Sequence, residues 1–242
     1  VYSYRQAILD GGNCRELVLA MVDRQVSTAV DQFIAPMYQW NSVAEWCSQV
    51  HHVEIDPQYI RGMESGLLKQ HILEEGRMQA QDELEERIDE NLPDGDDETG
   101  WNWQALSKWG NLNYTLNTNA PELKKVMDRD GRTGLYAYLN ERAQESVAKF
   151  DLEPVDTFVR DDWGAVSLSG WLVQQYGLAV DSKDIDGLEP DDARDLVGKR
   201  VRKMYREKEV RFPVSVGFHG FTHTDGGGTH LDREGLVKWA ND

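Results

Sequence analysis

Apolar residues that recur three and four positions apart run through most of this chain, a spacing typical of amphipathic helices that pack one face against a core. The first run follows Asn13, a residue suited to cap a helix. Its apolar members are Leu17, Met21, Val22, Val26, Val30 and Phe33. Two further runs consist of Tyr59, Ile60, Met63, Leu67 and Ile72, and of Leu196, Val197, Val201, Met204 and Tyr205. The pattern predicts an all-α fold.

Residues suited to helix starts precede three long predicted helices. Asp56-Pro57 places a capping residue before a proline at the first helical position. Asn119, with Glu122 three residues later, forms a capping box. Asp191 and Asp192 add negative charge to the first turn of the third helix, where the helix dipole favours it.

Two segments interrupt the helical pattern. Residues 82–98 hold ten acidic residues and one arginine, with Pro93 and Gly95 among them. A helix should therefore end near Leu92, where an acidic linker begins. Residues 213–228 contain five glycines and no helical period, which predicts a loop.

Aromatic residues also recur at a period of about 60 residues, which indicates an internal repeat. Trp46, Trp109 and Trp171 serve as anchors. Around them, matching residues stand eight before (Tyr38, Trp101, Trp163), six before (Trp40, Trp103, Ala165), three before (Val43, Leu106, Leu168), five after (His51, Tyr114, Tyr176) and seven after (Val53, Leu116, Leu178). Each unit is predicted to join a short helix to a longer one. The units span residues 37–98, 99–160 and 161–228, and 229–242 begin a fourth around Trp239.

The repeated aromatic residues have two possible roles. Their aliphatic neighbours favour a place in the core of each unit. The alternative is an exposed aromatic groove that holds an unfolded peptide.

Composition narrows the functions further. The 242 residues carry a formal net charge of −17, which argues against nucleic-acid binding because phosphate neutralisation needs clustered cations. No run reaches the roughly 18 to 20 apolar residues of a membrane span. With only two cysteines, a cytoplasmic location is expected. The missing initiator methionine and an ending inside a predicted helix suggest a piece of a longer protein.

Residues for catalysis or cofactor binding are not apparent. The chain lacks a phosphate-binding P-loop, a Gly-x-Ser-x-Gly motif and a Cys-x-x-Cys motif. We therefore expect no catalytic residue, cofactor or metal. A metal site at His219, His223 and His230 is an alternative, although solvated loop histidines explain them as well.

One basic stretch runs against the overall charge. Residues 194–211 contain eight cations and three acids. A solvated helix face is the simplest explanation. The alternative is a contact with lipid headgroups or an acidic partner, for which the candidates are Arg200, Arg202, Lys203 and Arg206.

The motifs and their order resemble a known family. Trp101, Leu106, Trp109, Tyr114 and Leu116 resemble the W-D-x-x-x-L-x-x-W-x-x-x-x-[FY]-x-L motif of the helical wing of SecA, the preprotein translocase motor. Residues 163–178 match it again. Residues 1–11 resemble a run in the long scaffold helix of that family, and residues 202–209 resemble the Y-x-x-K-E segment after the wing.

The resemblance implies a non-catalytic fragment in which residues 1–36 begin the scaffold helix and wing units follow. Ordinary family members have one wing unit, whereas this chain has three and the start of a fourth. The nucleotide-binding motifs would lie before this fragment, so ATP and Mg²⁺ belong to the parent chain. Implied partners are the rest of the motor, unfolded preprotein and the membrane channel, with no nucleic acid. The implied location is the cytoplasm, at the inner face of the cell membrane.

The sequence is also compatible with two other functions. An autonomous helical-repeat interaction module could resemble the wing through helix patterning alone. A metal-dependent enzyme would use the three histidines at 219, 223 and 230.

Overall fold

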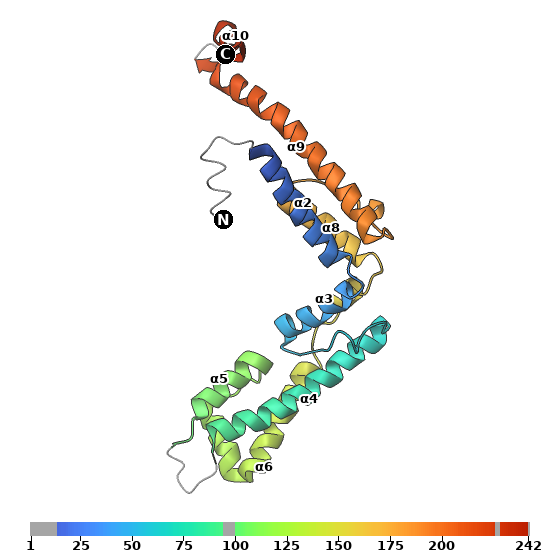
Figure 1. The fold of residues 1–242 in the computed structure, drawn as a ribbon. Coiled ribbons are helices and arrows are strands. Elements are labelled where there is room, and N and C mark those ends of the chain that lie inside the picture. The colour runs from blue at the N-terminus through green and yellow to red at the C-terminus, as the bar shows by residue number, and fades with distance from the viewer. Residues whose placement is uncertain (1–13, 94–99, 226–227, 242) are drawn as a thin grey trace. The chain divides into compact units, whose positions relative to one another are not determined.

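A computed structural model describes residues 14–93, 100–225 and 228–241 (Figure 1). The fold is all-α apart from one two-stranded sheet, as the sequence predicts. The chain forms two compact units, each described here by itself. Unit 1 combines Val1–Ala35 with Gly164–Asp242, and unit 2 is Pro36–Trp163.

Unit 1 is built around two helices that pair over much of their length. They are α2 (Cys14–Phe33) and α9 (Pro190–Gly220). With α8 (Trp163–Tyr176) they enclose a core of Val22, Val26, Val30, Leu168, Leu172, Val197 and Val201. The short helix η3 (Ser182–Asp184) precedes α9. After α9 come β1 (Thr222–Asp225), β2 (Gly228–Leu231) and α10 (Arg233–Asn241).

Unit 2 contains two neighbouring cores. One lies between the end of α4 (Ser65–Asn91), α5 (Trp103–Tyr114) and α6 (Ala120–Val147). The other lies between α3 (Tyr38–Trp46), η1 (Cys47–His51), the start of α4 and α7 (Val155–Phe158). Leu73 and Phe150 pack against both cores. Gly131, at φ 67°, kinks α6.

The chain leaves unit 1 and returns to it at nearly the same place. A Cβ atom on Gly164 would lie 2.3 Å from the carbonyl oxygen of Phe33. The two ends that flank unit 2 therefore touch inside unit 1. Unit 2 is an insertion between α2 and α8.

Two predicted helix boundaries are confirmed. The side chain of Asn119 accepts a hydrogen bond from the backbone N–H of Glu122, 3.0 Å away, and so caps α6. Helix α4 ends at Asn91, two residues before Pro93. The predicted cap Asn13 and most of the acidic linker lie outside the described residues.

The predicted helix start at Asp56-Pro57 is wrong. Helix α4 begins at Ser65, and residues 57–62 form turns. The Asp56 carboxylate accepts a hydrogen bond from the backbone N–H of Gln58 at 2.8 Å, which closes a local turn. Gly62, at φ 78°, then redirects the chain toward α4.

The predicted loop at residues 213–228 is also wrong. Helix α9 continues through Pro213 to Gly220, and a hairpin follows it. A Cβ atom on Gly217 would lie 2.7 Å from the Trp239 ring. Glycine therefore allows α10 to approach α9 closely, rather than marking a loop.

Candidate functional site

The three anchor tryptophans make the same contact in the structure. Each ring stands edge-on to the ring five residues later, in a T-shaped pair. The ring centroids are 4.9 Å apart for Trp46 and His51, 5.6 Å for Trp109 and Tyr114, and 5.5 Å for Trp171 and Tyr176. The sequence repeat thus corresponds to a repeated local geometry.

Burial differs among the repeat positions. The residues six and three before each anchor are buried: Trp40, Val43, Trp103, Leu106, Ala165 and Leu168. The anchors are only half-buried, as are the aromatic residues eight before them. Two of those residues donate hydrogen bonds through the indole N–H: Trp101 to the Pro93 carbonyl and Trp163 to Ser42 Oγ, both at 3.1 Å. The anchors cover the edge of each core more than they fill it.

The helix that carries each anchor also ends in the same way. The residue six after the anchor has a left-handed backbone: His52 at φ 56°, Thr115 at φ 50° and Gly177 at φ 66°. The backbone N–H of the residue that follows donates a hydrogen bond to the carbonyl oxygen six residues before it, at 3.2 to 3.4 Å. These bonds satisfy carbonyls that a helix end would leave unpaired. The spacing of apolar residues does not predict this ending, for which Gly177 is the one residue-type signal.

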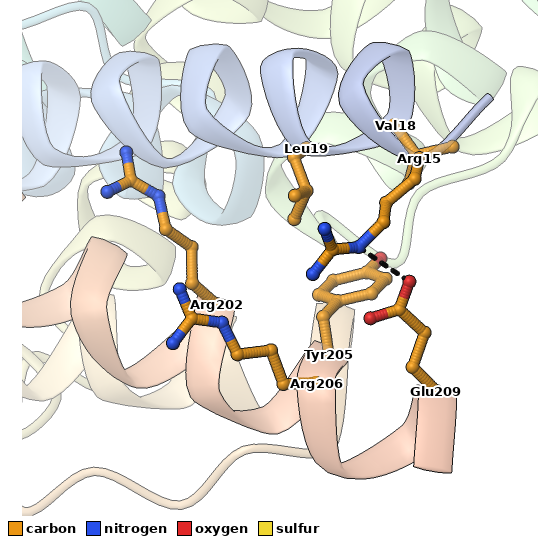
Figure 2. Close-up of a pocket in the computed structure, with 7 residues that line it drawn as sticks. All are labelled: Arg15, Val18, Leu19, Arg202, Tyr205, Arg206 and Glu209. Carbon is orange, nitrogen blue, oxygen red and sulfur yellow. Dashed lines mark ion pairs between the residues drawn. The ribbon is translucent and has the colours of Figure 1, made fainter. Parts of the chain in front are cut away.

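A groove between α2 and α9 includes two of the predicted contact residues, Arg202 and Arg206. It encloses about 260 Å³ and is lined by Arg15, Val18, Leu19, Arg202, Tyr205, Arg206 and Glu209. Figure 2 shows the Tyr205 ring rising from α9 toward α2, with arginine side chains beside it. Its floor is therefore apolar and its rim mainly basic.

Ion pairs hold the two sides of this groove together. Arg15 Nε lies 2.7 Å from a Glu209 carboxylate oxygen, drawn as a dashed line in Figure 2. Arg202 donates two hydrogen bonds to Asp23, at 2.9 and 2.8 Å, and these raise the pKa of its guanidinium. Both pairs are largely exposed, so each adds at most about 1 kcal/mol of stability.

The structure divides the four predicted contact residues into two kinds. Arg200 and Arg202 pair inside unit 1, Arg200 with Asp184 at 2.6 Å. Lys203 and Arg206 make no ion pair within the part of the chain that the structure describes. They are exposed on α9, and Arg206 lines the groove.

The three histidines of the metal alternative lie near the end of α9. His219 is in its last turn, and His223 stands opposite His230 in the hairpin. Within residues 14–93, 100–225 and 228–241, no three or more metal-binding side chains converge.

Burial raises the pKa of the Cys47 thiol to about 12, so this cysteine stays protonated and unreactive at neutral pH. Among the helices in these ranges, none has the apolar length that a bilayer crossing requires.

Comparison with known proteins tests the resemblance. The chain aligns along its whole length with protein translocase subunit SecA 1 of Rhodopirellula baltica, at 26% identity over 244 residues. This chain resembles a segment of SecA. The alignment covers 19% of that subunit, so the chain spans about a fifth of its relative's length. The SecA resemblance seen in the motifs is thereby confirmed. No family model and no solved structure matches the chain.

Proposed function

We propose that this chain is a helical wing and scaffold segment of a SecA-like preprotein translocase, and that it acts by packing and surface contact. The observation that carries the proposal is the alignment with SecA 1 over the entire chain. The repeated pairs of short and long helices support it, because the wing motifs fall on the short helices α5 and α8.

The proposal places the chemistry elsewhere in the parent protein. ATP and Mg²⁺ bind there to a motor outside this segment, which is itself not catalytic. The segment contacts the rest of the motor and helps to form the clamp around the unfolded preprotein near the membrane channel. Its location is then the cytoplasmic side of the membrane, and nucleic acid plays no part.

Lys203 and Arg206 are the residues that we assign to a partner contact. Both are exposed cations on one side of α9, and Arg206 borders an apolar groove. Their charge suits an anionic group of the partner. Arg200 and Arg202 are less suited, because their charges are already balanced by Asp184 and Asp23.

The first test uses the full-length protein that contains this chain. We expect preprotein to stimulate its ATP hydrolysis, and deletion of the segment to remove this stimulation. The Lys203→Gln/Arg206→Gln variant should reduce preprotein transport into membrane vesicles. Lys199→Gln is the matched control, because Lys199 lies on the same helix and pairs with Asp195. A full-length protein that binds no nucleotide would overturn the proposal in favour of an autonomous helical-repeat module.

The second test concerns the clamp. An unfolded preprotein, with its folded form as control, is titrated into the isolated chain while tryptophan fluorescence is followed. Saturable binding of the unfolded form alone supports a contribution to the clamp. The absence of binding, with a cooperative melting transition intact, would limit the segment to a scaffold role.

A further inference from the structure

Five half-buried rings follow one another along the edge of the core that α3, η1 and α7 share. Successive centroids are 4.2 Å apart from Phe150 to His51, 4.9 Å from His51 to Trp46, 5.8 Å from Trp46 to Phe158 and 5.2 Å from Phe158 to Trp163. The row begins beside the boundary of the two cores of unit 2, because Phe150 packs against both. It ends at the last residue of this unit.

His51 joins two parts of unit 2 that are far apart in sequence. Its ring stacks on Phe150 at an interplanar angle of 22° and meets Trp46 edge-on at 85°. Its Nε2 lies 3.3 Å from the carbonyl oxygen of Asp151. Because that oxygen can only accept, Nε2 carries the donated hydrogen and Nδ1 is the site left for a second proton.

We propose that His51 is a pH-sensitive clasp, whose neutral ring holds η1 against the connection between α6 and α7 and whose protonation loosens that contact. The other repeats lack this sensitivity, because Tyr114 and Tyr176 occupy the equivalent position. Imidazole is the one side chain that ordinarily changes charge between pH 5 and 8.

The groups around His51 set the direction of the response. Burial is the main influence and lowers the pKa of the imidazole below 6.5, and the adjacent His52 acts in the same direction. The carbonyl and the carboxylate of Asp151 oppose this shift. Trp46 and Phe150 bring no charge. The other charged residues within residues 38–53 and 147–160 are Glu45, Lys149, Glu153, Asp156 and Arg160, all exposed.

A lowered pKa means that the folded protein binds the proton less readily than the unfolded chain. The stabilising contact is therefore complete above about pH 6.5. It weakens as the pH falls below that value and levels off below the pKa of the folded state. Between pH 7.5 and 5.5, the equilibrium constant for closing the clasp should fall by at most about tenfold.

Hydrogen exchange of the 242-residue chain tests the proposal. Protection, corrected for intrinsic exchange, is measured at pH 7.5 and 5.5 in residues 38–53 and 147–160. Residues 103–116, which contain Trp109 and Tyr114, are the internal reference. We expect protection in the first two segments to fall in acid relative to the reference. His51→Tyr should remove this difference, because it installs the residue type of the other repeats.

His52→Asn is the matched control. His52 is exposed and has a left-handed backbone, which asparagine tolerates. This variant should respond to pH as the unaltered chain does. The proposal is overturned if His51→Tyr keeps the full response or if His52→Asn loses it. Should His51→Tyr fail to fold, an NMR titration of His51 in the unaltered chain decides, and a pKa at or above 6.5 overturns the proposal.

Discussion

The two units resemble each other in helix pattern and differ in charge. Unit 1 has 14 basic and 17 acidic residues, whereas unit 2 has 12 basic and 26 acidic residues. In unit 1, ion pairs tie α2 to α9 at intervals: Arg15 to Glu209, Asp23 to Arg202, and Asp31 to Arg194. Unit 2 also has ion pairs, but its acids outnumber its bases too far for pairing to neutralise them. The same repeated pattern therefore occurs in a unit with a nearly balanced net charge and in a strongly acidic unit. This is possible because the contacts that recur in each repeat are apolar and aromatic.

The units also differ in continuity. Unit 2 is one continuous segment with its own cores, whereas unit 1 is closed by helices from both ends of the chain.

Removal of residues 36–163, with a short Gly-Ser link between Ala35 and Gly164, should leave unit 1 folded. The ends already meet, since Gly164 lies against the Phe33 carbonyl. The unfolding enthalpy should fall by roughly 90 kcal/mol, the usual contribution of a segment this long. Calorimetry checks this, with circular dichroism to confirm the remaining helix. Loss of all cooperative unfolding would mean that unit 1 depends on unit 2.

Trp103→Ala should destabilise unit 2 by about 3 to 5 kcal/mol, as expected for a buried aromatic residue. Trp103 is 8% exposed, whereas the anchor Trp109 is half-buried. Trp109→Ala should therefore cost about half as much. Denaturant unfolding measures both, and Leu112→Ala is the control, because Leu112 is 71% exposed. An equal loss of unfolding free energy for the two variants would contradict this prediction. It would show that the half-buried anchor stabilises the repeat as much as the buried Trp103 does.

Much of the fold was predictable, because the helical period and the aromatic spacing are local patterns. The cap at Asn119 is local as well. The turn at Asp56-Pro57 was not predictable, since the same residues suit a helix start and an Asp-stabilised turn. What decides between them is the burial of Ile60 against residues far away in sequence.

The candidate groove was only partly predictable. The basic stretch at residues 194–211 is visible in the sequence, but its ion pairs with Asp23, Asp31 and Asp184 depend on tertiary packing. The sequence indicated four candidate cations. The structure shows that Arg200 and Arg202 pair with acidic residues of unit 1, and we propose a partner contact for Lys203 and Arg206. The insertion of unit 2 was missed for the same reason, because no local pattern shows that Phe33 and Gly164 are neighbours.

Gly110→Ala should destabilise unit 2 by about 1 to 3 kcal/mol through overpacking. A Cβ atom there would lie 2.7 Å from Leu116 Cδ1, in the contact that closes the helix end. Gly170→Ala in α8 is the matched control, because no atom lies within 4 Å of its added Cβ. Helix propensity should make that change stabilising by up to about 1 kcal/mol. Thermal unfolding compares the two, and a neutral Gly110→Ala would show that Leu116 can move aside.

Asp23→Asn should have the smallest effect on stability. Together with salt, it should show that the stability of the two units responds differently to charge screening. At low salt it should destabilise unit 1 by about 0.5 to 1 kcal/mol, because the pair with Arg202 is largely exposed. The loss should shrink as salt rises from about 0.05 M to 1 M, where screening shortens to about 3 Å. In the unaltered chain the same salt should raise the unfolding midpoint of unit 2, since it screens repulsion among the excess carboxylates. Urea unfolding at several salt concentrations measures both responses. If salt left the Asp23→Asn loss unchanged and did not raise the midpoint of unit 2, the charge difference between the units would have no part in their stability.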